Sequence, residues 1–362
     1  MKKLLAIVLA VVMAMGVFAV AATARGFWTE PMVDGSLVLR SDGTVWRMPW
    51  DGGTDTPMQI QGFNNIIAIS ESFALHNDGT VWRTNLDGVT AVQIQGLSNI
   101  TAISESSALR NDGTVWRTRQ IWDEGTRSWI FSGEQVQGLS NITAISGRYA
   151  LRNDGTVWSS RGERGEQVQG LSNITAISRS SALRNDGTAW AFPYGRGEQV
   201  QGLSNIIALF DGNFLRNDGT AWFWIAETAT CFQGEQVQGL SNIISIPARG
   251  HYLRNDGTVW RAVTVWNNGN MSVRGEQIQG FTNIATFSVA TGKNGWTIIA
   301  IRNDGTVWTM FRHVDYGITE PPRQIPNFNV GPLTQPTPAW HETLPTFLQW
   351  ILRWIFFGWI WM

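Results

Sequence analysis

The chain contains very little cysteine and histidine. Its 362 residues include one cysteine, Cys231, and four histidines at positions 76, 251, 313 and 341. A single cysteine excludes a disulfide within the chain, and leaves only a pairing of Cys231 with another chain. The histidines form no His-Glu-x-x-His motif and no cysteine pair exists, so the sequence predicts neither a metal site nor a cofactor.

Charge is also scarce. Charged residues make up 15% of the chain, the formal net charge is −1, and Lys293 is the one lysine after Lys3. Nucleic-acid-binding proteins neutralise phosphates with clusters of lysine and arginine, so we expect no nucleic-acid partner. A Gly-x-Ser-x-Gly elbow and a phosphate-loop spacing are missing too. No catalytic residues are therefore predicted.

What the chain does contain is a repeat. The segment Ala-Leu-Arg-Asn-Asp-Gly-Thr-Val-Trp at 108–116 returns at 150–158, and near copies give eight hairpin segments spaced by 32 to 48 residues. Asp-Gly between short β-rich runs favours a two-residue turn, which places Leu109 opposite Trp116, with Ala108 and Val115 on the other face. We assign a structural role, and not calcium binding, to the repeated residues Asp42, Asp78, Asp112, Asp154, Asp186, Asp218, Asp256 and Asp304, and Trp46, Trp82, Trp116, Trp158, Trp190, Trp222, Trp260 and Trp308.

A second phrase, Glu-Gln-Val-Gln-Gly-Leu-Ser-Asn-Ile-Thr-Ala-Ile-Ser, occupies 134–146 and 166–178 and alternates with the first. Each unit then holds four short β-rich runs: A (Ile-Thr-Ala-Ile-Ser), B (Tyr-Ala-Leu-Arg), C (Thr-Val-Trp) and D (Glu-Gln-Val-Gln). Four antiparallel strands per unit are typical of a β-propeller blade, whereas a β-helix has shorter, more uniform rungs. Apolar residues on both faces of the B–C hairpin suit a blade buried between two neighbours. The sequence therefore predicts an all-β propeller.

These motifs resemble the repeat of the RCC1-like (regulator of chromosome condensation) propellers, in the form found in bacterial secreted proteins. That repeat runs Val-x-Ala-Ile-Ala, Ala-Leu-x-x-Asp-Gly-x-Val and Trp-Gly, and the likeness covers Ser36–Val330. The glycine that follows the tryptophan is replaced here, for example by Arg47, Arg83 and Arg117, so we expect the region between strands C and D to differ from the family. The resemblance implies a seven-bladed alternative, and some secreted members bind β-lactamases.

The number of strands predicts how the ring closes. Strands B, C and D occur eight times, if Gln324–Ile325 is counted as a divergent copy of strand D. Strand A occurs seven times, and none precedes the first hairpin. We expect Asn327–Pro332 to lie against Ser36–Arg40, completing the first blade and protecting the open edges. This gives eight blades closed by a C-terminal strand.

Antiparallel alternation places the A–B and C–D connections at one end of the ring, here called the variable face. The B–C and D–A turns lie at the other end, the uniform face. Long connections rich in aromatic residues and arginine gather on the variable face, where such residues usually dominate binding energetics. We predict a binding site there, formed by Trp122, Arg127, Trp129, Phe131, Tyr194, Trp224, Trp266, Trp296, Arg312 and Tyr316. The alternative is that these side chains cover the edges of their own blades.

The two ends of the chain differ from the repeat. Residues 1–24 have a basic start, an apolar run and Ala22-Thr23-Ala24, as in a cleaved secretory signal, with an uncleaved anchor as the alternative. The propeller spans 25–331 and a proline-rich linker spans 332–346. Residues 347–362 form a hydrophobic tail that as a helix reaches about 24 Å, short of the roughly 30 Å hydrocarbon layer. We expect this tail to lie in a membrane, to be recognised by a sorting machinery, or to dock on the propeller. The residues predicted for membrane association or sorting are Trp350, Arg353, Trp354, Trp359 and Trp361.

Together these features predict an exported, non-catalytic binding propeller, secreted or held at the cell envelope, whose partner is a protein or a polymer. A secreted inhibitor of β-lactamases is one alternative. The other is an enzyme that acts on glycans in the central channel, which paired carboxylates at the axis would favour.

Overall fold

The computed structural model describes residues 32–49, 56–85, 88–125, 128–228, 231–267, 270–292, 295–313 and 319–333. The predicted signal peptide, the hydrophobic tail and most of the linker lie outside these residues, as do Arg127 and Tyr316.

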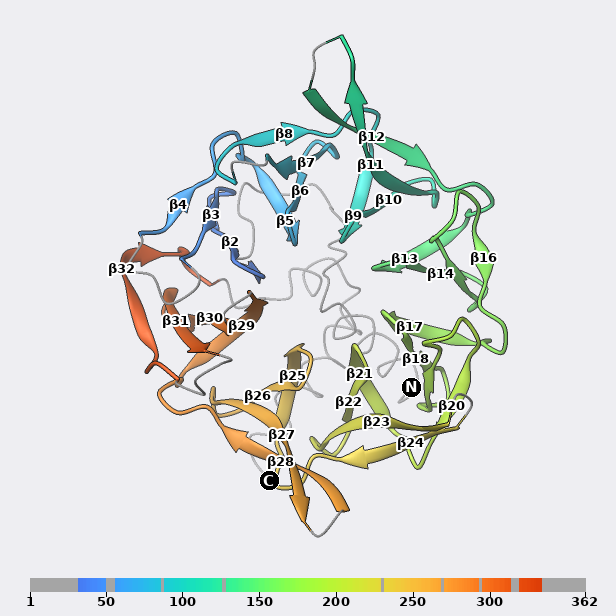
Figure 1. Cartoon of the computed structure of the whole chain (residues 1–362), viewed down its shortest axis with the longest axis vertical. Coiled ribbons are helices and arrows are strands. Elements are labelled where there is room, and N and C mark those ends of the chain that lie inside the picture. The colour runs from blue at the N-terminus through green and yellow to red at the C-terminus, as the bar shows by residue number, and fades with distance from the viewer. Residues whose placement is uncertain are drawn as a thin grey trace, which may run out of the picture.

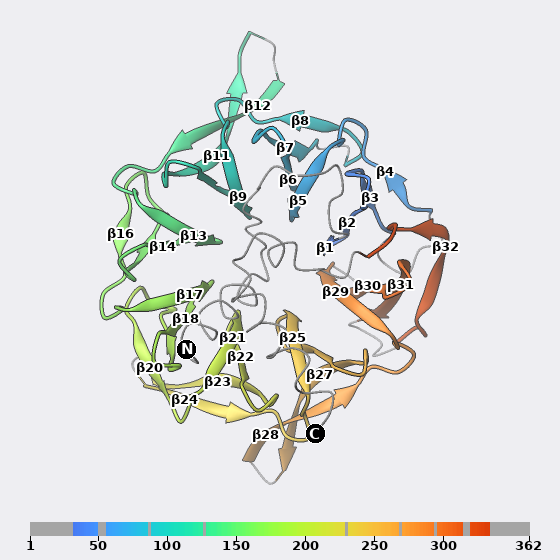
Figure 2. The same ribbon diagram turned by 180° about the vertical axis from the view of Figure 1, so that it is seen from behind.

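The described strands are arranged in four-stranded antiparallel blades around a common axis (Figures 1 and 2). Strand A of each blade lies innermost and strand D outermost, and no helix occurs in the described ranges. The predicted all-β propeller built from repeated four-stranded sheets is therefore confirmed.

The first four blades follow the chain in order. Blade 1 contains β1 (Met32–Asp34), β2 (Leu37–Leu39), β3 (Val45–Arg47) and β4 (Met58–Gln59). Blade 2 contains β5 (Ile66–Ser70), β6 (Phe73–His76), β7 (Val81–Thr84) and β8 (Ala91–Gln93). Blade 3 contains β9 (Ile100–Ser104), β10 (Ser107–Arg110), β11 (Val115–Asp123) and β12 (Ser128–Gln135). Blade 4 contains β13 (Ile142–Ser146), β14 (Tyr149–Arg152), β15 (Val157–Ser159) and β16 (Glu166–Gln167).

The remaining blades repeat this order. Blade 5 contains β17 (Ile174–Ser178), β18 (Ser181–Arg184), β19 (Ala189–Ala191) and β20 (Glu198–Gln201). Blade 6 contains β21 (Ile206–Phe210), β22 (Asn213–Arg216), β23 (Ala221–Thr228) and β24 (Cys231–Gln236). Blade 7 contains β25 (Ile243–Ala248), β26 (His251–Arg254), β27 (Val259–Asn267) and β28 (Asn270–Gln277). Blade 8 contains β29 (Ile284–Thr291), β30 (Gly295–Arg302), β31 (Thr306–His313) and β32 (Arg323–Asn329).

The repeated hairpin has a longer turn than predicted. The Gly113 N–H donates to the Arg110 carbonyl at 3.0 Å and the Arg110 N–H donates to the Thr114 carbonyl at 2.9 Å, so three residues form the loop. Only Gly113 has a positive φ, of 78°, which makes this a type I turn closed by a bulged glycine. The register therefore shifts by one residue from the expected one: Leu109 lies opposite Val115, and Trp116 lies opposite Ala108.

The repeated aspartate explains why the turn takes this form. Asp112 Oδ1 accepts hydrogen bonds from the Thr114 N–H at 2.9 Å and from the Thr114 hydroxyl at 2.6 Å. The same hydroxyl accepts the Trp116 indole N–H at 3.0 Å. All eight copies contain this chain of bonds, which supports the structural role predicted for the repeated aspartates and tryptophans.

Arginine at the end of strand B completes the unit. The Arg110 guanidinium lies 3.9 Å from the centroid of the Trp116 ring, and its Nε donates to the Ser98 carbonyl at 3.1 Å. A planar group with several donors can stack and donate at once, which an ammonium group does not do. This accounts for arginine in place of lysine at the position.

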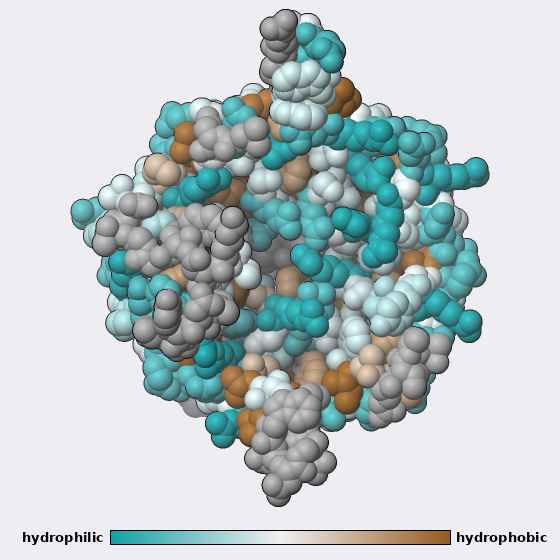
Figure 3. All heavy atoms as spheres, in the orientation of Figure 1, coloured by the Kyte–Doolittle hydropathy of each residue, from teal (hydrophilic) through white to brown (hydrophobic). Residues whose placement is uncertain are grey.

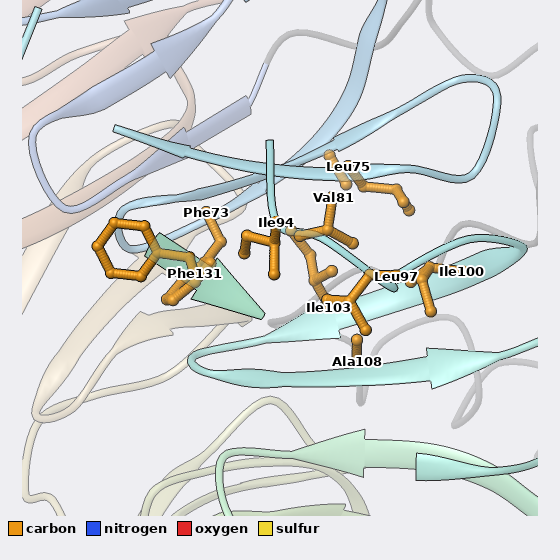
Figure 4. Packing of buried hydrophobic residues seen from close by; sticks show 10 residues of the cluster. Phe73, Leu75, Val81, Ile94, Leu97, Ile100, Ile103, Ala108 and Phe131 are labelled. Carbon is orange, nitrogen blue, oxygen red and sulfur yellow. The ribbon is translucent and has the colours of Figure 1, made fainter. Parts of the chain in front are cut away.

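Hydrophobic clusters fill the space between neighbouring blades. Leu109 and Val115 pack with Leu139 and Ile142, toward blade 4, whereas Ala108 packs with residues of blade 2. Figure 4 shows the second cluster, in which side chains from both blades and Phe131 meet between the sheets. Both faces of a blade are therefore buried, as the sequence predicted.

At the outer circumference, from blade 1 to blade 7, the chain around the end of strand D pairs briefly and in parallel with the outer strand region of the next blade. The Gln95 N–H donates to the Phe131 carbonyl at 2.9 Å, and the Gly133 N–H donates to the Gln95 carbonyl at 2.7 Å. Similar pairings join blades 1 and 2, 3 and 4, 4 and 5, and 6 and 7, and between blades 5 and 6 the strands β20 and β24 merge into one sheet. Gly133 lets the Leu97 side chain pass across its backbone, where a Cβ atom would overlap that side chain.

At the inner rim, serine hydroxyls join neighbouring blades. The N–H of Glu105, in the A–B turn of blade 3, donates to Ser70 Oγ of blade 2 at 2.9 Å. Equivalent bonds run from the amides of Gly147, Arg179 and Asp211 to Ser104, Ser146 and Ser178. Between blades 8 and 1, the Gly35 N–H of blade 1 donates to Ser288 Oγ of blade 8 at 2.9 Å.

The contact between blades 8 and 1, here called the seam, is formed differently from the expected closing strand. β1 occupies the strand A position of blade 1, with Val33 opposite Val38, and residues 323–329 form strand D of blade 8. Asn327–Pro332 therefore does not pair with Ser36–Arg40 as an added strand. The sequence reading missed β1 because Met-Val-Asp shares no letter pattern with the other A strands.

The last residue of β32 and the segment that follows it nevertheless contact the first hairpin. The Ser41 N–H donates to the Val330 carbonyl at 2.8 Å, and Arg40 Nε donates to the Asn329 carbonyl at 2.9 Å. These bonds match the bonds that the other B–C hairpins make with their D–A turns. The C-terminal segment thus supplies a turn to the seam.

Candidate functional site

Several connections predicted as loops on the variable face are extended hairpins. β11 and β12 stay paired from Trp116–Gln135 to Asp123–Ser128, and β27 and β28 from Trp260–Gln277 to Asn267–Asn270. Strands β29 and β30 extend in the same way in the A–B connection of blade 8. The hairpin of β11 and β12, here called the Trp hairpin, stands out from the edge of the ring (Figures 1 and 3).

The tip of the Trp hairpin is apolar on both faces. Trp122 lies opposite Trp129 with ring centroids 5.2 Å apart and an interplanar angle of 68°, and Ile121 lies opposite Ile130 on the other face. These four side chains are 40% to 48% exposed. A solvent-exposed hairpin normally alternates apolar and polar residues, so exposure on both faces marks the tip as a contact surface.

Phe131 is a correction to the predicted site. It is buried, 4% exposed, in the cluster between blades 2 and 3, and the Arg83 guanidinium lies 4.0 Å from its ring centroid. Phe131 lies on the same strand as the exposed tip residues. It is buried because blade 2 packs against this part of the strand, which the sequence alone does not show. Phe131 therefore anchors the base of the Trp hairpin.

The other predicted residues do not gather into one patch. Tyr194 is 72% exposed in the C–D loop of blade 5. Trp224 is half-buried, packs edge-on against Phe232 at 5.0 Å and lies against the hydrophobic cluster between blades 5 and 6. Trp296 and Arg312 are cross-strand partners in blade 8, and Trp266 lies on β27 opposite Met271.

Sequence reasoning missed a pocket beside the base of the Trp hairpin. Its volume is about 380 Å³, and its lining contains four arginines from blades 3 and 4; the lining residues are Ser106, Arg117, Thr118, Arg119, Arg148 and Arg161. Arg117 occupies the position where the resembled family has glycine, so that departure was the available signal. Because the arginines come from different repeats, only the fold brings them together.

A third group of charged residues lies on the A–B turns around the axis. Glu71, Glu105, Arg179 and Asp211 have φ between 44° and 53°, a region where the other described non-glycine residues are all asparagine. Arg179 Nη2 lies 3.0 Å from Glu105 Oε1, and the Glu71 N–H donates to Asp34 Oδ2 at 2.9 Å. Charged residues held in a backbone region that favours glycine suggest a functional constraint at this rim.

The environment of these carboxyls changes their acidity. Burial raises the pKa of Asp34, and the Glu71 amide only partly opposes this. Desolvation raises the pKa of Glu71, with the charges of Glu105 and Asp34 acting in the same direction. Carboxyl groups with raised pKa values are candidates for proton transfer.

Two further properties concern only the described ranges. No group of three or more histidine, cysteine, aspartate and glutamate residues there is arranged to hold a metal ion. No helix there has the length and apolar character needed to cross a bilayer.

Comparisons with known proteins show distant structural likeness. No protein-family model matches the chain, and no curated protein matches it. The chain is similar to the crystal structure of Saccharomyces cerevisiae Sqt1, with 11% identity and a TM-score of 0.34, over 82% of this chain and 86% of that one. It is also similar to the Myceliophteria thermophila Cps50 (Swd1) beta-propeller domain, with 13% identity and a TM-score of 0.31, over 62% and 84% of the two chains.

Proposed function

We propose that this protein is an exported binding propeller that captures a protein or polymer through its variable face. The observation that carries the proposal is the Trp hairpin, whose four apolar tip residues are 40% to 48% exposed on both faces. Burying such residues in a complex removes apolar surface from water at about 25 cal/mol per Å². Tryptophan is also enriched among residues that dominate binding energies.

The proposed scaffold is a closed ring of eight blades related to the secreted RCC1-like propellers. Hydrogen bonds across the seam, from Gly35 to Ser288 and from Ser41 to Val330, support closure. A rigid ring suits this function because it holds the Trp hairpin outward at little entropic cost. The uniform face, made of eight similar Asp-Gly turns, is then a scaffold.

The proposed location is outside the cell or at its envelope. Support comes from the signal-like residues 1–24 and from the tryptophan-rich tail at 347–362. Cell fractionation of the full chain and of a variant lacking residues 347–362 tests the tail. We expect the deletion to release the protein from the membrane fraction, and an unchanged distribution contradicts this part of the proposal.

A capture experiment tests the binding role of the hairpin. The immobilised full chain is exposed to envelope extract, and the bound material is compared with that held by the Trp122→Ala/Trp129→Ala variant. We expect the variant to lose the captured species and to keep the wild-type melting temperature within a few degrees. Ile244→Ala, which removes a 48% exposed side chain on β25, serves as the control. Equal capture by all three proteins contradicts the proposal.

The carboxyls at the inner rim favour a second candidate, glycan hydrolysis at the axis. Glycosidases use two carboxyl groups, one of which acts as an acid with a raised pKa. The raised pKa of Glu71 beside Asp34 and Glu105 gives such a pair a physical basis. Release of reducing ends from envelope glycans, abolished by Glu71→Gln, supports this candidate, and no release by the wild type excludes it.

A further inference from the structure

The pocket at the base of the Trp hairpin, here called the arginine pocket, is lined by Arg117, Arg119, Arg148 and Arg161. We propose that it binds a doubly charged oxyanion, either a phosphate monoester or a pair of neighbouring carboxylates. This site is separate from the apolar tip of the hairpin, and the inference holds whether or not the tip captures a partner.

The balance of charge in the pocket leaves room for an anion. Arg119 is paired with Glu134 and lies 3.3 Å from Glu163 Oε1. Among the described residues, Arg117, Arg148 and Arg161 have no carboxylate within ion-pair distance. The nearby Glu105 is engaged by Arg179 at 3.0 Å. Four guanidinium groups and the two carboxylates of Glu134 and Glu163 give the pocket a net charge of about +2, which a doubly charged anion balances.

The donors are partly preorganised. Arg117 Nη1 donates to the Arg161 carbonyl at 2.6 Å, which ties blade 3 to blade 4, and the buried Nε of Arg117 has no hydrogen-bond partner. A buried donor without an acceptor is costly, and an anion oxygen in the pocket relieves that cost. Arg161 also lies 5.8 Å from the centroid of the Tyr149 ring, which limits its orientations.

The remaining features fit an oxyanion of modest size. Arg148 is exposed on the A–B turn of blade 4 and has no side-chain hydrogen bond among the described residues, so it can close over a ligand. The Ser106 hydroxyl adds a neutral donor at the wall, whereas the Thr118 hydroxyl donates to the Ser106 carbonyl at 3.4 Å. Guanidinium groups bind carboxylate and phosphate through two parallel hydrogen bonds, which explains arginine at all four positions. A volume of about 380 Å³ lies within the range of small-ligand pockets.

Calorimetric titration of the full chain tests the proposal, with sodium phosphate in one arm and sodium malonate in the other. Both titrations are run at constant ionic strength against a chloride blank. Phosphate binding alone identifies a phosphate monoester as the natural group, and malonate binding alone identifies paired carboxylates. Absence of binding in both arms overturns the proposal.

Variants establish that the measured site is the arginine pocket. We expect Arg148→Gln/Arg161→Gln to weaken binding at least about tenfold, because two charge-assisted hydrogen-bonding groups are lost. Glu163→Gln should strengthen binding, since it removes a competing carboxylate. Arg249→Gln, on the exposed A–B turn of blade 7, is the matched control and should bind like the wild type. Unchanged affinity in the double variant overturns the assignment, and the opposite shift expected for Glu163→Gln guards against loss of binding by misfolding.

Discussion

At the scale of the residue, the main structural feature is a short chain of hydrogen bonds that occurs in each of the eight B–C hairpins. Asp112 holds the Thr114 hydroxyl, the hydroxyl holds the Trp116 indole, and Arg110 covers the ring. The sequence alone predicted the turn, the aspartate and the structural tryptophan, because these depend on neighbours within a few residues. The predicted register was wrong, because the expected two-residue turn requires a positive φ at both Asp112 and Gly113. The hydrogen bonds from Thr114 to the Asp112 carboxylate instead keep Asp112 at a negative φ.

The eight aspartates predict a loss of stability in acid. The Thr114 hydroxyl, and then its amide, lower the pKa of Asp112, and the pKa of each of the other seven is lowered as well. A carboxyl whose pKa is lower in the folded state contributes stability above its ordinary pKa of about 4, and loses it as the pH falls through the folded value. We therefore expect the melting temperature to fall below about pH 4.

Melting curves between pH 7 and pH 2.5 measure this effect. The Asp112→Asn/Asp154→Asn variant should show a shallower decline than the wild type, because two titrating groups are removed. Asp34 and Glu71 act in the opposite sense, since their pKa values are raised in the folded protein. Identical declines in the two proteins contradict a role for the aspartates.

The contrast between Phe131 and Trp129 gives a second prediction at the residue scale. These residues lie two positions apart on β12, yet Phe131 is 4% exposed and Trp129 is 48% exposed. We expect Phe131→Ala to lower the free energy of unfolding by about 3–5 kcal/mol, as for other buried aromatic residues. Trp129→Ala should cost about 0.5–1.5 kcal/mol, mainly the lost contact with Trp122. Urea unfolding distinguishes the two, and similar losses would show that the Trp hairpin tip is part of the core.

At the scale of the element, strand D links one blade to the next. Sequence patterns identified the four strands of most blades because alternation and turn residues are local. They did not identify the parallel pairing at Gln95 and Gly133, which joins segments from neighbouring repeats. The long C–D connections were expected as loops, yet β11–β12 and β27–β28 continue as paired strands. Cross-strand pairs such as Trp122 with Trp129 provide the reason.

The glycine of the strand D phrase gives a prediction at this scale. Gly133→Ala places a Cβ atom against Leu97 of the preceding turn, so either the leucine or the strand must shift. We expect a loss of about 1–3 kcal/mol in the free energy of unfolding, typical of overpacking. Gly125→Ala is the control, because its Cβ meets only an Asp123 oxygen at 3.4 Å. Equal stability of the two variants in urea contradicts the tight packing at Gly133.

At the scale of the whole molecule, the ring makes a site from residues that the sequence keeps apart. The arginine pocket joins Arg117 and Arg148 of adjacent blades, and the inner rim joins Asp34 with Glu71. The sequence predicted which connections lie on the variable face and which on the uniform face. It did not predict these two residue groups, because they depend on which turns meet across a blade boundary. The same limit applies to the seam, where β1 is too short to carry the repeat pattern.

The central claim is that blades 8 and 1 make inner-rim and turn hydrogen bonds like those between other blades, so that the ring is closed. Hydrogen–deuterium exchange of the full chain measures this at the amides of Gly35 and Ser41, which donate across the seam to Ser288 and Val330. We predict that these amides are protected to the same degree as that of Gly147, which makes the equivalent bond between blades 3 and 4. Rapid exchange at Gly35 and Ser41, with Gly147 protected, would mean an open arrangement and contradict the account.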